Sequence, residues 1–147
     1  MRVLVLDDDP LTSFTLARLF AIRGIQVVSV SSAEAAERTI ERERFDAILV
    51  DAQADQAKGL RVLDRARQLD AGISLFVLSD REPDRRPGDS DIYYIEKPWD
   101  GFFLLDIVRA RCDGERIVQA RVQDDRPTVQ MRPVRNHRRS LRESAGP

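Results

Sequence analysis

The chain has 147 residues, of which 42% are apolar and 33% charged, and its formal net charge is -1 at pH 7. This length fits one domain with a possible extension, and the apolar content is sufficient for a core, which excludes a chain that is disordered throughout. The near-zero charge gives no bulk attraction to nucleic acid or membranes. The single cysteine, Cys112, excludes an internal disulfide and fits a reducing cytoplasm.

Short apolar runs alternate with helical patterns in the first half of the chain. Residues 3–6 are continuously apolar, as is typical of a buried parallel strand, and they end at Asp7. Pro10 suits the first turn of a helix, and Gly24 suits the position just past its end. Residues 26–30 predict a second strand, and a second helix follows it. No apolar run approaches the length of a membrane span.

The second half repeats this alternation. We expect strands at 47–50, 75–78 and 92–95, a loop after the first of these, a helix from about 59 to 70, and a final helix around 103–110. Strands alternating with helices predict right-handed crossovers and a parallel α/β sheet covered on both faces. In such sheets the working residues lie beyond the carboxyl ends of the strands. That rule selects five polar residues, namely Asp7, Asp8, Asp51, Ser79 and Lys97.

These five side chains suit phosphoryl chemistry. Three carboxylates held together repel one another unless a cation neutralises them, and Mg2+ prefers one or two carboxylates with waters and a phosphate oxygen. Asp51 would be the nucleophile that forms an aspartyl phosphate. The metal and Lys97 would offset charge on the phosphoryl group, and Ser79 could donate a hydrogen bond to it.

Over residues 1–112 the sequence resembles response-regulator receiver domains of two-component signalling. VLVLDDDP resembles the acidic first-strand motif, and FDAILVD places Asp51 at the phosphorylation position. VLS supplies Ser79, and YIEKP supplies Lys97 with Tyr94 at the aromatic switch position. Gly59 stands eight residues after Asp51, where the family commonly has glycine. Each motif alone is weak, but their order and spacing together are specific.

The resemblance implies a flavodoxin-like (CheY-like) fold with a doubly wound five-stranded parallel sheet in the order 2-1-3-4-5 and five helices. It implies that Mg2+ is held by Asp8, Asp51 and the backbone carbonyl of Gln53, with Asp7 acting through water. Ser79 and Tyr94 would form the switch. A sensor histidine kinase or histidine phosphotransfer protein would be the phosphodonor, a further protein would be the target, and the location would be cytoplasmic. The protein would not be an enzyme in the usual sense.

Two departures from the family pattern concern the connection after Ser79. Pro83, Pro87 and Gly88 break any long helix, so we expect the fourth helix to be shortened, distorted or missing. Asp80 occupies a place where the family usually has a small residue, and its carboxylate either repels a phosphoryl group or points to solvent. A third departure is Asp55, where the family usually has proline.

Residues 113–147 differ in composition from the rest, with eight arginines against five acidic residues and few apolar side chains. We expect a domain boundary near residue 113 and a mostly disordered tail. The tail arginines, such as Arg135, Arg138, Arg139 and Arg142, could bind nucleic acid, an acidic partner or the domain itself. The tail has no helix-turn-helix pattern and no interleaved aromatic residues, which argues against specific DNA recognition.

Three functions remain open at this point. The leading hypothesis is a signalling protein that is switched by phosphorylation of Asp51 and acts through protein contacts. The alternative is a receiver-like binding module whose output does not depend on phosphate, as the broken fourth-helix segment and Asp80 suggest. The third is a nucleic-acid-associated protein that works through its tail, for which steeply salt-sensitive binding would be diagnostic.

Overall fold

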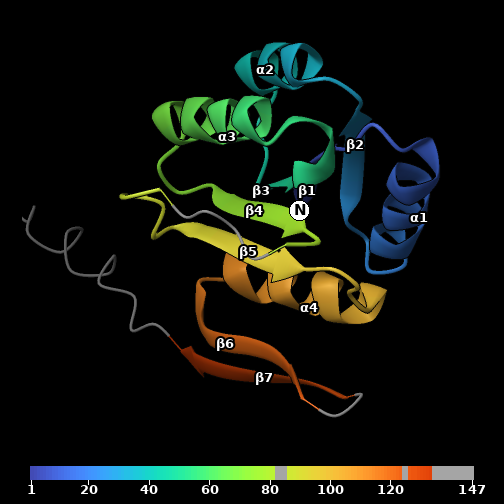
Figure 1. The fold of residues 1–147 in the computed structure, drawn as a ribbon, viewed down its shortest axis with the longest axis vertical. Helices are drawn as coiled ribbons and strands as arrows, with labels where there is room; N and C mark the ends of the chain where they lie inside the picture. The colour runs from blue at the N-terminus through green and yellow to red at the C-terminus, as the bar shows by residue number, and fades with distance from the viewer. Residues whose placement is uncertain (82–85, 124–125, 134–147) are drawn as a thin grey trace, which may run out of the picture.

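The computed structural model describes residues 1–81, 86–123 and 126–133, with the backbone alone described at 54, 55, 115–123 and 126–133. The elements alternate between strands and helices up to residue 112, and a pair of strands follows (Figure 1). In chain order they are β1 (Arg2–Leu6), α1 (Pro10–Ala21), β2 (Gln26–Val30), α2 (Ala33–Arg42), β3 (Ala47–Asp51), α3 (Ala52–Leu69), β4 (Ser74–Ser79), β5 (Ile92–Glu96), α4 (Gly101–Cys112), β6 (Glu115–Gln123) and β7 (Arg126–Pro133).

The first five strands form one parallel sheet in the order β2-β1-β3-β4-β5. The predicted flavodoxin-like fold and strand order are therefore confirmed. β1 and β3 lie at the centre, with Leu6 opposite Val50, and β4 continues the sheet with Leu78 opposite Asp51. This register places the ends of the central strands at one edge, because parallel strands share their direction.

Alternate side chains of the strands enter two separate cores, one on each face of the sheet. Val5, Leu49 and Phe76 pack with α1 and α4 on one face, whereas Leu4 and Ile48 pack with α2 and α3 on the other. Figure 1 shows α2 and α3 on one side of the strands and α4 on the opposite side. Burial on both faces explains why β1, β3 and β4 are continuously apolar in sequence.

The helix α3 begins directly after β3, which differs from the predicted loop before residue 59. Asp51 is its N-cap, and the Asp51 side chain accepts a hydrogen bond from the backbone N–H of Gln53. The intervening AQADQAK contains good helix formers and no proline, so nothing in it resists helix formation. Gly59 lies where the helix crosses β3, and a Cβ there would stand 2.5 Å from Cγ1 of Val50.

Between β4 and β5, residues 80, 81 and 86–91 contain no helix, which agrees with the expected loss of the fourth helix. Pro83 lies outside the described residues. The chain instead turns tightly at Arg86–Asp89, where Gly88 has a φ of +97° and the Asp89 N–H donates to the Arg86 carbonyl. The structure thus has four helices in its described part, where the family resemblance implied five.

The segment after α4 also differs from the expected disorder. β6 and β7 pair antiparallel, and β6 lies beside α4 (Figure 1). Alternating apolar and polar residues in VQARVQ are a strand signal, which the high arginine content of the segment obscured. Residues 134–147, including Arg135, Arg138, Arg139 and Arg142, lie outside the described residues, and the domain boundary near 113 stays a prediction. None of the helices described here combines the length and hydropathy needed to cross a bilayer.

Candidate functional site

The sheet brings the predicted residues to one edge. Asp7 follows β1, Asp51 ends β3, Ser79 ends β4 and Lys97 follows β5. The backbone N–H of Lys97 donates to the carbonyl of Ser79 at 2.7 Å, which fixes the ends of the last two strands against each other. The fold therefore assembles the constellation that the strand-end rule selected.

Asp51 and Lys97 form the central contact of this site. Nζ of Lys97 donates to Oδ2 of Asp51 at 2.5 Å, while Oδ1 of Asp51 accepts from the Gln53 N–H at 2.9 Å. The Asp51 side chain is 7% exposed and that of Lys97 is 21% exposed. A largely buried carboxylate that accepts from an ammonium and from a backbone N–H is held in a fixed orientation, which suits a nucleophile.

Asp7 is more deeply buried and has one oxygen without a partner. Its Oδ1 accepts from the Asp9 N–H at 2.8 Å, but its buried Oδ2 has no hydrogen-bond partner. Burial raises the pKa of the Asp7 carboxyl above its usual value, and the negative charge of Asp51 raises it further. Asp8 is exposed and lies beside Asp7 and Asp51 in the wall of a cleft of about 220 Å³.

These oxygen atoms fit a hard divalent cation. The orphaned Oδ2 of Asp7 lacks the partner that a buried polar atom normally has, and Asp8 adds an exposed carboxylate in the same cleft. Across the described residues no group of three or more acidic, histidine or cysteine side chains converges in a metal cage. Mg2+ does not require one, because it usually keeps several waters and takes only one or two carboxylates.

Gln53 lies in the first turn of α3, two residues after Asp51. In a helix the carbonyls point toward the C-terminal end, so the Gln53 carbonyl is directed away from Asp51 in this structure. Its role as a metal ligand stays a prediction, and it requires the first turn of α3 to unwind. The Gln53 side chain instead donates from Nε2 to Oδ2 of Asp80 at 2.7 Å.

Asp80 is therefore bonded across the site. The hydrogen bond from Gln53 lowers the pKa of the exposed Asp80 carboxyl below its usual value. Asp80, Gln53 and Lys97 line a second, wider cleft of about 610 Å³, together with Pro98 and Trp99 from the connection before α4. The sequence singled out Asp80 as unusual but gave no signal for its bond to Gln53, which is far from it in the chain.

Ser79 lies at the site but turns its hydroxyl elsewhere. The residue is 8% exposed. Its Oγ donates to the Arg81 carbonyl at 3.0 Å and accepts from the Arg81 N–H at 3.2 Å. This local turn satisfies the hydroxyl within the chain. A bond from Ser79 to a phosphoryl group would require Oγ to leave Arg81.

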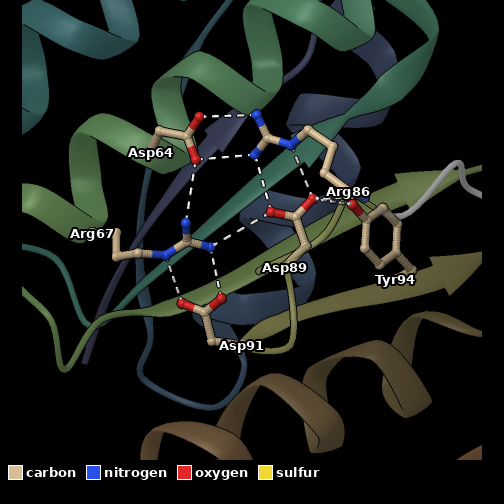
Figure 2. Close-up of polar contacts among 6 residues, drawn as sticks. All are labelled: Asp64, Arg67, Arg86, Asp89, Asp91 and Tyr94. Carbon is tan, nitrogen blue, oxygen red and sulfur yellow. Dashed lines mark hydrogen bonds and ion pairs between the residues drawn. The ribbon is translucent and has the colours of Figure 1, made fainter.

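Tyr94 is half-buried on β5, and its ring packs on the α2 and α3 side of the sheet. Its hydroxyl donates to Oδ2 of Asp89 at 3.4 Å, in the turn that precedes β5 (Figure 2). The sequence also missed Glu34 and Lys58, which line the Asp7 cleft from α2 and α3. Neither lies at a strand end, so the rule that located the other residues could not select them.

Comparison with known proteins identifies the family that shares this arrangement. Residues 3–109 match the family model described as the response regulator receiver domain. A curated relative from Leptolyngbya boryana, an uncharacterised 14.6 kDa protein in the sodA1 3' region, is 29% identical over 120 residues. That match covers 76% of this chain and 90% of the relative.

Solved structures show the same fold. A response regulator receiver protein from Sinorhizobium medicae aligns with a TM-score of 0.70 and 20% identity, over 77% of this chain and 94% of that one. A CheY-like receiver domain from Methanospirillum hungatei aligns with a TM-score of 0.66 and 23% identity, over 76% of this chain and 93% of that one.

Proposed function

Because this chain belongs to the response regulator receiver family, we propose that it is a signalling module switched by phosphorylation of Asp51. The observation that carries the proposal is the buried Asp51 carboxylate at the end of β3, held by Nζ of Lys97 at 2.5 Å. In this proposal the output is a change in protein contacts rather than turnover of a substrate.

The proposed reaction is a transfer between two nucleophiles. One carboxylate oxygen of Asp51 attacks the phosphorus of a phosphohistidine on the donor, forming a P–O bond while the P–N bond to the imidazole breaks. The leaving imidazole nitrogen takes a proton from solvent. The Lys97 ammonium lies within reach of the transferring group and offsets its charge, so the lysine stabilises both the transition state and the acyl phosphate.

Mg2+ is the proposed cofactor, and it would screen the phosphoryl oxygens from the surrounding carboxylates. The unpartnered Oδ2 of Asp7 supports this assignment, as does Asp8 in the same cleft. Asp8 and Asp51 are the proposed direct ligands, with Asp7 acting through water.

The proposed phosphodonor is a sensor histidine kinase or a histidine phosphotransfer protein in the cytoplasm, and the proposed target is a further protein. The described residues after α4 form the two-stranded pair of β6 and β7. In this proposal the chain signals by binding its target or by passing the phosphoryl group on.

The test is phosphorylation by acetyl phosphate in the presence of Mg2+, followed by intact-protein mass spectrometry. We expect one phosphoryl group on the wild type and none on Asp51→Asn. The matched control is Asp106→Asn, which removes an exposed carboxylate on α4, away from the cleft residues, and should leave modification unchanged. Modification of the Asp51→Asn variant at the wild-type level would refute Asp51 as the acceptor.

A second candidate is a receiver-like binding module with constitutive output. Two contacts favour it: Oγ of Ser79 is satisfied by Arg81, and Asp80 is tied to Gln53 next to the nucleophile. The two candidate functions differ in how far from Asp51 the binding of a phosphoryl mimic changes the structure. Beryllofluoride with Mg2+ should shift backbone NMR signals at Tyr94 and in residues 86–91 if the switch operates, and only near Asp51 if it does not.

A further inference from the structure

The turn before β5 replaces an expected helix with a fixed arrangement of two charged residues. Arg86–Asp89 has the sequence RPGD, with proline and a positive-φ glycine at the central positions, as a type II turn requires. The Asp89 N–H donates to the Arg86 carbonyl at 3.1 Å, and the Ile92 N–H donates to the Asp89 carbonyl at 3.1 Å. The backbone therefore holds Arg86 and Asp89 next to each other at the start of β5.

Within this turn the Arg86 guanidinium clamps the Asp89 carboxylate. Nε of Arg86 donates to Oδ2 at 3.0 Å and Nη2 donates to Oδ1 at 3.1 Å, while the Arg86 backbone N–H lies 3.3 Å from Oδ2 (Figure 2). Asp89 is 4% exposed, so its charge is largely removed from water. These hydrogen bonds lower the pKa of the Asp89 carboxyl, which therefore stays ionised near neutral pH.

The same arginine extends the clamp to α3. Nη1 and Nη2 of Arg86 each donate to one carboxylate oxygen of Asp64 at 3.0 Å. Arg67 donates to Asp64 at 3.3 Å and to both oxygens of Asp91 at 2.7 and 2.6 Å. Figure 2 shows the two guanidinium groups between the carboxylate of Asp64 on α3 and those of Asp89 and Asp91 before β5. Paired, bidentate contacts of this kind hold a geometry better than isolated surface ion pairs do.

Tyr94 joins this network through its hydroxyl. The hydroxyl donates to the same Asp89 oxygen that receives Nε of Arg86. Asp89 precedes β5, whereas Lys97 follows it, so this bond directs the tyrosine hydroxyl toward the end of β5 away from the ion pair with Asp51.

We propose that Asp89, clamped by Arg86, is a positioning residue that holds Tyr94 away from the phosphorylation site and couples it to α3. The inference rests on the proposed function of Asp51. If the Asp89–Tyr94 bond belongs to the unphosphorylated state, it opposes the change that phosphorylation brings. The bond then weakens the binding of a phosphoryl mimic by the factor by which it favours the unphosphorylated state. By linkage, removing the bond tightens the binding by that factor.

The test measures the affinity for beryllofluoride in the presence of Mg2+. Trp99 is the only tryptophan and lines the same cleft as Lys97 and Asp80, so its fluorescence can follow binding. We expect about two- to fivefold tighter binding for Asp89→Ala and for Tyr94→Phe, as implied by the loss of the one Asp89–Tyr94 hydrogen bond that both substitutions remove. The double variant should bind no more tightly than the tighter single variant, because both substitutions remove the same bond.

Two further variants distinguish a positioning role of Asp89 from a general loss of rigidity in the domain. Asp89→Glu retains the charge and should recover at least part of the wild-type affinity. Arg65→Ala removes an ion pair from α3 to Glu41 outside the network and should leave the affinity unchanged. Circular dichroism confirms that each variant is folded, and Tyr94→Phe, which leaves the bonds between Arg86 and Asp89 in place, carries the test if the alanine variant is not.

The outcomes distinguish the two levels of the proposal. Unchanged or weaker binding by Asp89→Ala, or additive effects in the double variant, would overturn the role of Asp89 and leave the phosphorylation site intact. A wild-type protein that binds no beryllofluoride would overturn the proposed function and this inference together.

Discussion

Nζ of Lys97 lies 2.5 Å from Oδ2 of Asp51, so one buried carboxylate depends on one ammonium. Lys97→Met removes the cation and leaves the charge of Asp51 uncompensated. We expect the free energy of unfolding to fall by about 1–3 kcal/mol, less than for a fully buried pair because Lys97 is partly exposed. Urea denaturation measures this loss. The double variant Asp51→Asn/Lys97→Met should recover much of the lost stability. An equal loss in Lys97→Met and in the double variant would contradict the explanation.

Asp7 should destabilise the protein in the absence of metal. Its pKa is raised by burial, so at neutral pH its ionised form costs folding free energy. Asp7→Asn should therefore raise Tm by roughly 2–6 °C without Mg2+, the shift expected for a change of about 1 kcal/mol. Addition of Mg2+ should raise the Tm of the wild type and change that of the variant much less. Differential scanning calorimetry with and without EDTA tests both statements.

Two glycines that a Cβ would crowd should differ in their tolerance of alanine. At Gly59 the added Cβ meets Cγ1 of Val50 at 2.5 Å, and at Gly101 it meets Cδ2 of Leu19 at 2.6 Å. Valine in a strand has a restricted χ1, whereas the end of a leucine side chain can move aside. We expect Gly59→Ala to cost about 1–3 kcal/mol of stability and Gly101→Ala distinctly less. Equal losses on urea denaturation would show that Val50 adapts as readily as Leu19.

Acid should remove the contribution of Asp89 to stability. Its pKa in the folded protein is lowered from the usual 3.8 by the hydrogen bonds from Arg86. Its stabilising effect is therefore complete above the unfolded value and is lost as the pH falls through the folded value. The stability difference between wild type and Asp89→Asn should stay constant while the pH is well above 3.8 and should shrink as the pH falls below that value. Urea denaturation across this range gives the profile, and a difference that grows on acidification would contradict it.

The sheet and the strand-end residues were predictable because burial and chain direction dictate both. Continuous apolar runs identify β1, β3 and β4, and parallel strands necessarily end at the same edge. The loss of the fourth helix was predictable from the backbone restrictions of Pro87 and Gly88. The turn that replaces that helix was not predictable. Its pairing of Arg86 with Asp64 joins residues that are distant in sequence, and this pairing depends on the final position of α3.

Other features were missed because two local signals competed. The residues after Asp51 could form a loop or a helix, and the capping bond from Gln53 to Asp51 accompanies the helix. The arginine content of residues 113–147 indicated disorder, whereas the alternation within VQARVQ indicated a strand. At the site, the orientation of the Ser79 hydroxyl toward Arg81 depends on the conformation of a turn, which the identity of the serine does not determine.

The RPGD turn before β5 is joined to α3 by ion pairs between Arg86 and Asp64, whereas the inner strands are covered by apolar helices. These ion pairs are partly exposed to water, so this corner of the domain should open locally before the whole molecule unfolds. Backbone amides of β5 should then exchange with deuterium faster than those of β1 and β3, and salt should accelerate the exchange at β5 alone. The part of the domain that carries Tyr94 would thus be less stable than the centre of the sheet.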